Sequence, residues 1–244
     1  MKPATLIVDN LSGLFELAKA SLWGEITETS FSKGDFGMKW DPVMAINANA
    51  ARLSVRIAQK GINVIWVAHV SPDYMDMGPD PEQPKRRLKR LLGWDIDCPG
   101  SGAESIKRPF DECWHLITRP NESGSQPQRV LHVNEHIYEG ARFKSKSRKG
   151  VKGPIIPLQK GKGWEQAMAA LPPGVEQPRM ILICGEAGAG KTDFAFSAPQ
   201  PIVAIDMYGG CDEAARGKEA KVIKPTHADE VYKTLLKVEK GVDF

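Results

Sequence analysis

The chain of 244 residues suits one large domain or two small ones, and its apolar fraction of 41% is enough to bury a core. No run approaches the roughly 18 apolar residues of a membrane span, and the N-terminus lacks a signal-peptide pattern. We therefore expect a cytoplasmic protein without a membrane partner. The four cysteines form no C-x-x-C pair, which argues against structural zinc and predicts reduced thiols, most of them buried.

The net charge of +3 is unevenly distributed along the chain. Residues 141–163 include eight Lys or Arg and no acid, so the rest of the chain is net acidic. A basic, Gly-containing segment on an acidic body is typical of a phosphate-binding surface. A solvated basic loop is an equally good interpretation of the charge alone.

The first seventy residues predict two buried strands and two helices. Apolar runs rich in β-branched residues favour parallel strands over residues 4–8 and 62–70. Apolar side chains at helical spacing, and an Asp-Pro start for the second helix, favour helices over residues 11–23 and 41–60. Residues 25–40 between them show no period and predict a loop.

The middle of the chain predicts less regular structure. Residues 71–108 are rich in Pro, Asp and Gly and indicate an irregular surface segment, interrupted by a short basic helix at PKRRLKRLLGW (84–94). The runs DECWHLITR and QRVLHVNEH then predict a two-stranded hairpin with a long loop. His132 and His136 would lie on one face of its second strand with Asn134, but no third metal ligand is apparent.

The last third predicts a Pro-rich connector over residues 171–180, followed by a second alternation of strands and helices. Thr226 and Asp229 resemble a capping box for the last helix, which Gly241 closes. The expected helices cover 164–171, 191–197 and 226–240, and the expected strands 181–184, 201–206 and 220–224.

The most specific motif is G-x-x-x-x-G-K-T, which stands between a predicted strand and a predicted helix, as a nucleotide-binding P-loop requires. Its glycines let backbone N–H groups surround an anion. Lys191 would bridge the β- and γ-phosphates of ATP, and Thr192 would bind Mg²⁺. A chance Gly-rich turn is the alternative. The predicted nucleotide-binding residues are Gly185, Glu186, Ala187, Gly188, Ala189, Gly190, Lys191, Thr192 and Asp193.

A magnesium site on a P-loop needs a second carboxylate at the end of a neighbouring buried strand. Asp206 ends one predicted strand. Asp9 fits better, because it follows four consecutive strand residues, TLIV, at the end of the first buried run. We therefore predict that Asp9 and Thr192 share one Mg²⁺. A structural N-cap for the following helix is the alternative role for Asp9.

If the end of the chain is imagined to continue into its beginning, the elements take the order of an ordinary α/β nucleotide-binding domain. Such cuts are tolerated in exposed loops when the former termini lie close together. We therefore predict one circularly permuted domain over residues 1–244. Residues 1–170 would carry the Asp9 strand, the hairpin and the basic segment, 171–180 the connector, and 181–244 the P-loop half.

In that rotated order the chain resembles the RecA-like P-loop ATPases that phages encode for recombination and single-strand annealing. The segments GEAGAGKT, PIVAIDMYGG, TLIVDN, VIWVAH and KSKSRKG follow the order of that family. The resemblance implies an α/β fold with a mainly parallel central sheet flanked by helices and a β-hairpin extension. It also implies ATP and Mg²⁺ as ligands, a homo-oligomer, and action on single-stranded DNA in the host cytoplasm.

The resemblance also implies roles for individual residues. Asp9 would coordinate Mg²⁺, and His69 would sense the γ-phosphate from the tip of its strand. Lys144, Lys146 and Arg148 would approach the nucleotide of a neighbouring subunit or bind DNA. For His69, a hydrogen-bonded core histidine is the alternative.

Two departures concern the carboxylate that orients the attacking water. Tyr208 stands where RecA-like enzymes carry a glutamate, and Asn10 stands where additional-strand ATPases carry one. The sequence therefore leaves open a magnesium-dependent ATPase with slow or DNA-dependent turnover, and a nucleotide-binding scaffold or switch with little hydrolysis. A small-molecule kinase is the weakest reading, because no acceptor-binding segment is identifiable. The candidate substitutes for the missing base are Asp206, Glu186, Asp212 and Glu213.

Overall fold

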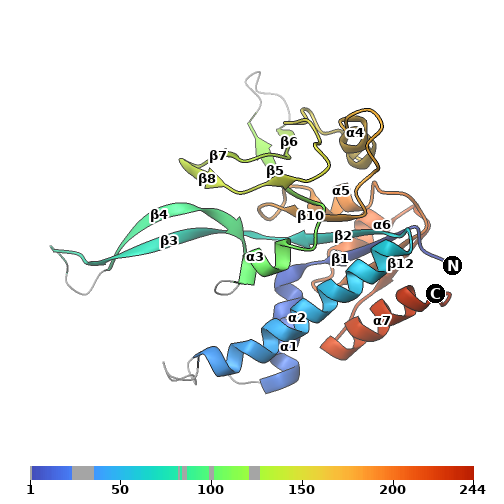
Figure 1. Cartoon of the computed structure of the whole chain (residues 1–244), viewed down its shortest axis with the longest axis horizontal. Helices are drawn as coiled ribbons and strands as arrows, with labels where there is room; N and C mark the ends of the chain where they lie inside the picture. Colours follow the sequence, from blue (N-terminus) through green and yellow to red (C-terminus); the bar gives the residue numbers. More distant parts are fainter. Residues whose placement is uncertain (1, 24–35, 82, 84–86, 99–101, 121–126) are drawn as a thin grey trace.

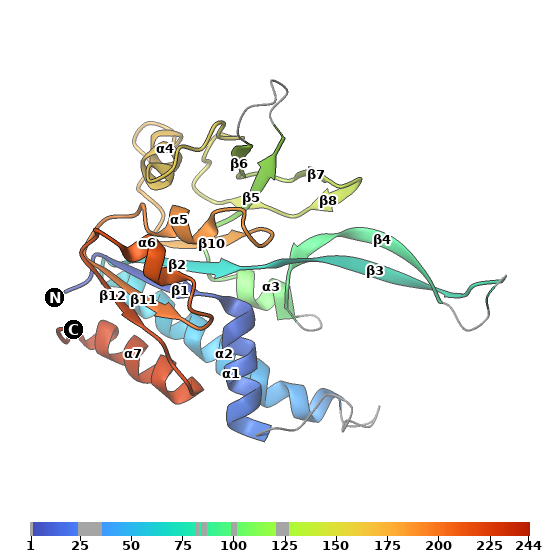
Figure 2. The ribbon, with the colours of Figure 1, turned by 180° about the vertical axis from the view of Figure 1, so that it is seen from behind.

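The computed structural model of the chain describes residues 2–23, 36–81, 83, 87–98, 102–120 and 127–244, and shows a mixed α/β architecture (Figure 1). A central sheet is flanked by helices on both faces, and a second, smaller sheet extends from its side (Figures 1 and 2). Among these residues, no helix combines the length and the apolar character that a membrane crossing needs. Most of the predicted loop at 25–40 lies outside the described residues. Its last part is wrong, because the second helix begins at Phe36, before the predicted start at Asp41, and holds Pro42 in its interior.

The central sheet has eight strands in the order β12-β11-β1-β2-β10-β5-β6, with β9 also paired to β5. The first six strands in this order are parallel, whereas β6 and β9 run antiparallel to β5. The expectation of a mainly parallel sheet is therefore corrected to a mixed sheet, because the hairpin and β9 add antiparallel pairs at one edge. The strands are β1 (Thr5–Asp9), β2 (Asn63–Ala68), β5 (Glu112–Arg119), β6 (Gln128–His132), β9 (Lys146–Ser147), β10 (Met180–Cys184), β11 (Ile202–Asp206) and β12 (Ala220–Ile223).

Alternate side chains of each strand enter two separate cores, one on each face of the sheet. Leu6 and Val8 belong to the core shared with the three long helices, whereas Ile7 belongs to the core beneath α4 and α5. Since both faces are covered, β1, β2, β10 and β11 are buried along their whole length, which explains their unbroken apolar runs. The helices are α1 (Leu11–Trp23), α2 (Phe36–Gln59), α3 (Gly102–Lys107), α4 (Gly163–Ala169), α5 (Lys191–Ala195), α6 (Cys211–Ala215) and α7 (Ala228–Lys240).

The parallel register brings the carboxyl ends of four central strands to one edge of the sheet. Asp9 pairs with Asp206 across β1 and β11 and with Val67 across β1 and β2, while Ala68 pairs with Cys184 of β10. The polar residues that follow these strands therefore converge at this edge, although they come from both ends of the chain.

The second sheet contains β3 (Val70–Pro79), β4 (Arg87–Ile96), β7 (His136–Tyr138) and β8 (Ala141–Phe143), in the order β3-β4-β8-β7. Strands β3 and β4 form a long hairpin that projects from the body (Figures 1 and 2). The predicted irregular segment and the short basic helix at 84–94 are therefore wrong over the described residues. Leucines at helical spacing suggested the helix, but the cross-strand pairs of β4 with β3 decide the structure.

The predicted hairpin of the middle segment is confirmed as β5 and β6, paired from His115–His132 to Arg119–Gln128. His132 and His136 do not share a strand, because β6 ends at His132 and β7 begins at His136. Their rings instead stack with centroids 3.8 Å apart. No group of His, Cys, Asp and Glu residues suited to a metal ion is present in the described part of the chain.

The last helix, α7, begins differently from the prediction. His227, not Thr226, is its N-cap and accepts the N–H of Asp229 at Nδ1 over 3.3 Å, while Glu230 accepts the N–H of Thr226. Gly241 ends the helix in the left-handed region, as predicted. The remaining predicted helices and strands agree with the structure to within a few residues. Three of the four cysteines, Cys113, Cys184 and Cys211, are buried, as expected.

Elements from both ends of the chain meet at the amino edge of the central sheet. Lys60, just after α2, donates to the carbonyl of Glu239 near the end of α7. Asn63 of β2 donates its backbone N–H to Ala4, just before β1, over 2.9 Å. The beginning and the end of the chain therefore lie near each other, as the predicted rotated order requires (Figure 1). The rotation itself stays a prediction.

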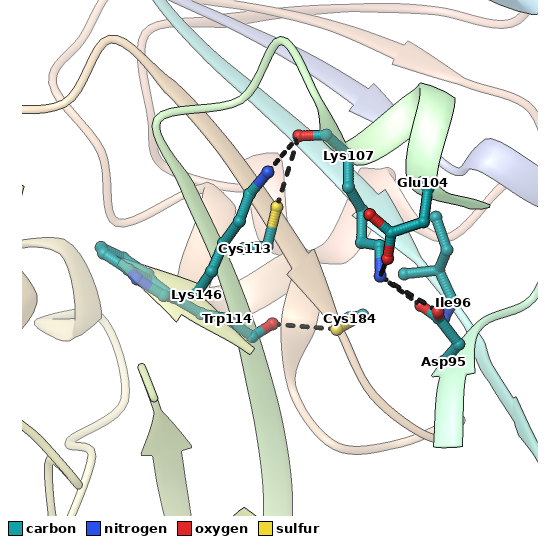
Figure 3. A network of polar contacts seen from close by, with 8 residues as sticks. All are labelled: Asp95, Ile96, Glu104, Lys107, Cys113, Trp114, Lys146 and Cys184. Atoms are coloured by element: carbon teal, nitrogen blue, oxygen red, sulfur yellow. Dashed lines mark hydrogen bonds and ion pairs between the residues drawn. The ribbon is translucent and has the colours of Figure 1, made fainter. Parts of the chain in front are cut away.

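The base of the projecting hairpin is fixed by a half-buried ionic network (Figure 3). The ammonium of Lys107 in α3 donates to both oxygens of Asp95 in β4, at 2.9 and 3.0 Å, and lies 2.9 Å from Glu104. The backbone carbonyl of Lys107 accepts from Lys146 at 2.8 Å. Burial alone would lower the pKa of Lys107, but the two carboxylates raise it above its usual value. The network therefore ties α3, β4 and β9 together.

Replacing Lys107 with Met should destabilise the protein by about 1 to 3 kcal/mol, because Asp95 loses its charged partner in a half-buried position. The loss should persist up to about pH 10 and disappear as the ammonium of the wild-type protein deprotonates above that range. Urea unfolding measures it. The Arg87→Met variant is the control, because its ion pair with Asp76 is exposed and should contribute little. Equal stability of the two variants would contradict this account.

Candidate functional site

The Gly-rich loop between β10 and α5 wraps closely around the start of its helix. Gly188 and Gly190 have φ values of +78° and +92°, which favour glycine. A Cβ on Gly185 would lie 2.2 Å from the carbonyl oxygen of Leu116. The ammonium of Lys191 donates to the carbonyls of Gly185 and Glu186 at 2.9 and 2.7 Å. Gly185, Gly188 and Gly190 therefore stand at positions that favour glycine, and the lysine lies over the loop.

A cavity of about 510 Å³ opens above this loop at the carboxyl edge of the sheet. It collects residues from β1, β6, β11, the Gly-rich loop, α5 and α6, and from the segments that follow β1 and β2. Of the nine predicted loop residues, Gly185, Glu186 and Ala189 do not line it, and Glu186 and Ala189 border a smaller neighbouring cavity. The predicted residues that line the main cavity are Asp9, His69, Ala187, Gly188, Gly190, Lys191, Thr192 and Asp193.

Asp9 and Thr192 lie side by side in this cavity. The hydroxyl of Thr192 donates to Oδ2 of Asp9 over 2.7 Å, and Asp9 is only 7% exposed. Burial raises the pKa of Asp9, the hydroxyl of Thr192 opposes this shift, and the charge of Asp206 reinforces it. The alternative role of Asp9 as an N-cap is wrong, because Asn10 accepts the N–H of Gly13 and caps α1 instead.

Asp206 lines the same cavity, but its carboxylate is already occupied. Its Oδ1 accepts the N–H groups of Tyr208, Gly209 and Gly210, at 3.2, 2.8 and 3.2 Å, and its Oδ2 accepts that of Cys211 at 2.9 Å. These bonds shape the turn from β11 into α6. The structure therefore gives Asp206 a structural task and leaves Asp9 as the carboxylate beside Thr192.

His69 follows β2 and stands between Asn10 and the P-loop lysine. Its Nε2 lies 3.2 Å from the amide nitrogen of Asn10, and its Nδ1 lies 3.5 Å from the ammonium of Lys191. Burial and the charge of Lys191 lower the pKa of His69. Burial also lowers the pKa of Lys191. The imidazole is therefore neutral at physiological pH and close to the group that would hold a phosphate.

The four candidate bases are not equivalent. Glu213 lines the main cavity with an exposed side chain, and Asp206 is occupied as described. Glu186 borders the smaller cavity, and Asp212 forms an ion pair with Lys224 at the surface. Glu213 is therefore the candidate best placed to reach a water molecule in the main cavity.

The predicted basic contacts lie elsewhere. Lys146 pairs with Cys113 at the beginning of β5, and its ammonium donates to Lys107. The guanidinium of Arg148 donates to the carbonyl of Arg108, and Lys144 is exposed. These contacts lie near the amino end of β5, whereas the cavity lies at the carboxyl ends of the parallel strands. Within one chain, the structure therefore does not bring the three basic residues together with Asp9 and Lys191.

Sequence reasoning missed two cations in the cavity, Arg129 and Lys160. Arg129 of β6 forms an ion pair with Asp193 at 2.8 Å, and its guanidinium lies 2.5 Å from where a Cβ of Gly190 would stand. Both cations also line a second cavity of about 600 Å³, which adjoins the first at Gly188. Lys160 belongs to the basic segment, and nothing in the sequence distinguishes it from the other basic residues there. Arg129 reaches the cavity because β6 pairs with β5, a long-range contact that the sequence does not show.

No protein-family model matches the chain, and searches of curated proteins and of solved structures gave no match.

Replacing Asp9 with Asn should raise the melting temperature when nucleotide and divalent cations are absent. The raised pKa of Asp9 means that its ionised form destabilises the fold at any pH above the ordinary carboxyl value of about 3.9. An amide keeps an acceptor for Thr192 and removes the buried charge. The gain should be full near pH 7 and vanish below about pH 4.

Thermal melts with a chelator across this pH range measure the effect, and Asp212→Asn at the surface is the matched control. A lower melting temperature for Asp9→Asn at pH 7 would show that the charge of Asp9 stabilises the fold.

Proposed function

We propose that this protein is a magnesium-dependent ATPase with a RecA-like P-loop fold in circularly permuted order. It would form homo-oligomers and act on single-stranded DNA in the cytoplasm, in recombination or strand annealing. The observation that carries the proposal is the 2.7 Å hydrogen bond between Thr192 of the P-loop motif and Asp9 at the end of β1. The sequence motif and the acid predicted for it are 183 residues apart in the chain.

The donor set suits Mg²⁺. Hard cations prefer oxygen ligands, and the site offers a carboxylate and a hydroxyl side by side on rigid elements. Asp9 is buried with a raised pKa, so a bound cation would stabilise its ionised form. When bound, Mg²⁺ neutralises charge on the phosphate oxygens, and Asp9 and Thr192 would hold it.

The sheet order supports the RecA-like part of the proposal. β2 lies between the P-loop strand β10 and the acid-bearing strand β1, so His69 at its end stands between the P-loop and Asp9. Lys191 would place its ammonium against the β- and γ-phosphates, and His69 would meet the γ-phosphate from the end of β2. Catalysis would then consist of positioning and charge neutralisation.

The two adjoining cavities suggest how ATP lies. The triphosphate would occupy the cavity above Lys191 and Thr192, and the base and ribose would extend past Gly188 into the second cavity. Arg129 and Lys160 border both cavities, so each is placed to contact phosphate or ribose oxygens. The second cavity also has apolar walls, Pro157 and Leu158, against which a base can pack.

Replacing Lys191 with Ala should abolish ATP binding, because it removes the cation that lies over the loop. Equilibrium titration with Mg-ATP measures this. Lys224→Ala is the matched control, since Lys224 is exposed, pairs with Asp212 and does not line the cavity. Unchanged affinity in the Lys191 variant would remove the basis for the site.

The DNA-binding part rests on the basic segment. Binding to oligo-dT should weaken steeply as salt increases, because phosphate contacts release counterions. Replacing the exposed pair Lys144 and Arg148 with Ala should lower the affinity and flatten the salt dependence. Fluorescence anisotropy at two salt concentrations measures both. Undetectable or salt-insensitive binding by the wild-type protein would count against DNA as a partner.

A nucleotide-binding scaffold or switch is the second candidate. The observation that favours it is the full occupation of Asp206 by four backbone N–H groups, together with Tyr208 and Asn10 at the positions of the usual glutamates. Steady-state phosphate release with and without single-stranded DNA separates the two functions. Release above the level of the Lys191→Ala variant supports the ATPase, and ATP binding without release supports the switch.

A further inference from the structure

Asn10 holds its side-chain amide in one orientation. Its Oδ1 accepts the backbone N–H of Gly13 over 2.9 Å at the start of α1. A backbone N–H can only donate, so the oxygen of the amide must face Gly13. The nitrogen of the amide therefore faces His69, 3.2 Å from Nε2.

This orientation determines which nitrogen of His69 carries the proton. The amide nitrogen of Asn10 has only hydrogens to offer, so Nε2 must accept. A neutral imidazole has one acceptor and one donor, so the proton lies on Nδ1. The Nδ1 atom lies 3.5 Å from the ammonium of Lys191, which has no acceptor, so both ring nitrogens face donors. The contact with Asn10 is shorter, at 3.2 Å, whereas 3.5 Å is at the limit of a hydrogen bond, so Asn10 decides the tautomer. The backbone of Gly185, which also binds Lys191, raises the pKa of His69, as an acceptor from the ring does.

The groups that face the ring favour the neutral form. Burial and Lys191 lower the pKa of His69, and the more distant charges of Asp9 and Asp97 oppose them without reversing the shift. A neutral ring has one N–H and one lone pair, so its orientation and tautomer decide which of them a bound phosphate would meet. A lone pair facing a phosphate oxygen is repulsive, whereas an N–H is a hydrogen-bond donor.

We propose that Asn10 is a positioning residue that fixes the tautomer of His69, so that Nδ1–H points over the P-loop and donates to an oxygen of the bound phosphate chain. This inference rests on the proposed ATPase function for its phosphate step, but not for the tautomer. It also gives a reason for Asn at this position. A carboxylate there would accept from Nε2–H and turn the lone pair of Nδ1 toward the phosphate.

Asn10→Asp separates this role from helix capping. Asp caps helices as well as Asn does, so an oxygen can still accept the N–H of Gly13, but the donor to Nε2 is lost. Asn10→Ala loses both the cap and the donor. Asn134→Asp is the matched control, because Asn134 is exposed and does not line the cavity.

The readout is the ¹⁵N spectrum of histidine-labelled protein without nucleotide, near pH 8, where the ring is neutral. In the wild-type protein and in Asn134→Asp, Nδ1 of His69 should show the shift of a protonated nitrogen and Nε2 that of an unprotonated one. In Asn10→Asp the proton should appear on Nε2 while the melting temperature stays close to that of the wild type. A proton on Nε2 in the wild-type protein, or an unchanged tautomer in Asn10→Asp, would overturn the assignment.

Kinetics test the phosphate step. Asn10→Asp should lower kcat for phosphate release at least about tenfold. Its carboxylate lies in the cavity proposed for the triphosphate, so ATP binding should weaken as well. An unchanged kcat would overturn the role in turnover. A wild-type protein that binds no ATP would overturn the proposed ATPase and with it the phosphate step. The ¹⁵N spectrum still tests whether Asn10 fixes the tautomer of His69, because it is recorded without nucleotide.

Discussion

Thr192 and Asp9 form a hydrogen bond although 183 residues separate them in the chain, and this contact exists because β1 and β10 both pair in parallel with β2. In this parallel register the carboxyl ends of the three strands lie side by side at one edge of the sheet. The acid after β1, the histidine after β2 and the P-loop after β10 therefore meet at one edge. A shift of one residue in either ladder would turn the strand side chains to the opposite core and move Asp9 away from Thr192.

The same edge gathers groups whose charged forms are disfavoured by burial. Burial raises the pKa of Asp9 and lowers those of Lys191 and His69, so each is shifted toward its neutral form. A core would not retain such groups for stability, because each is costly to bury in its charged form. A ligand that brings a cation to Asp9 and anionic oxygens to Lys191 would relieve both penalties. Perturbed groups of opposite sign, side by side in a cavity, are typical of functional sites.

The sequence predicted the parts of the site that depend on local pattern. The P-loop has a fixed spacing, and TLIVD is an apolar run that ends in an acid, so Lys191, Thr192 and Asp9 could be found from composition and order. Arg129 could not be found, because only the pairing of β6 with β5 carries it over Gly190. The projecting hairpin was missed for a related reason. The leucines of β4 have helical spacing, and their partners in β3 are visible only when both strands are placed.

The turn from β1 into α1 gives two consecutive residues different tasks. Asp9 completes the strand and faces Thr192, while Asn10 begins the helix by accepting from Gly13. The hydrogen bond from Gly13 holds Oδ1 of Asn10 at the helix start, so Nδ2 faces His69. The bond that caps the helix therefore also places a donor against Nε2. A glutamate at this position has a longer side chain with only acceptors, so it could reach a water molecule but could not donate to Nε2. Asn10 therefore offers His69 a donor at a position where a carboxylate would offer only acceptors.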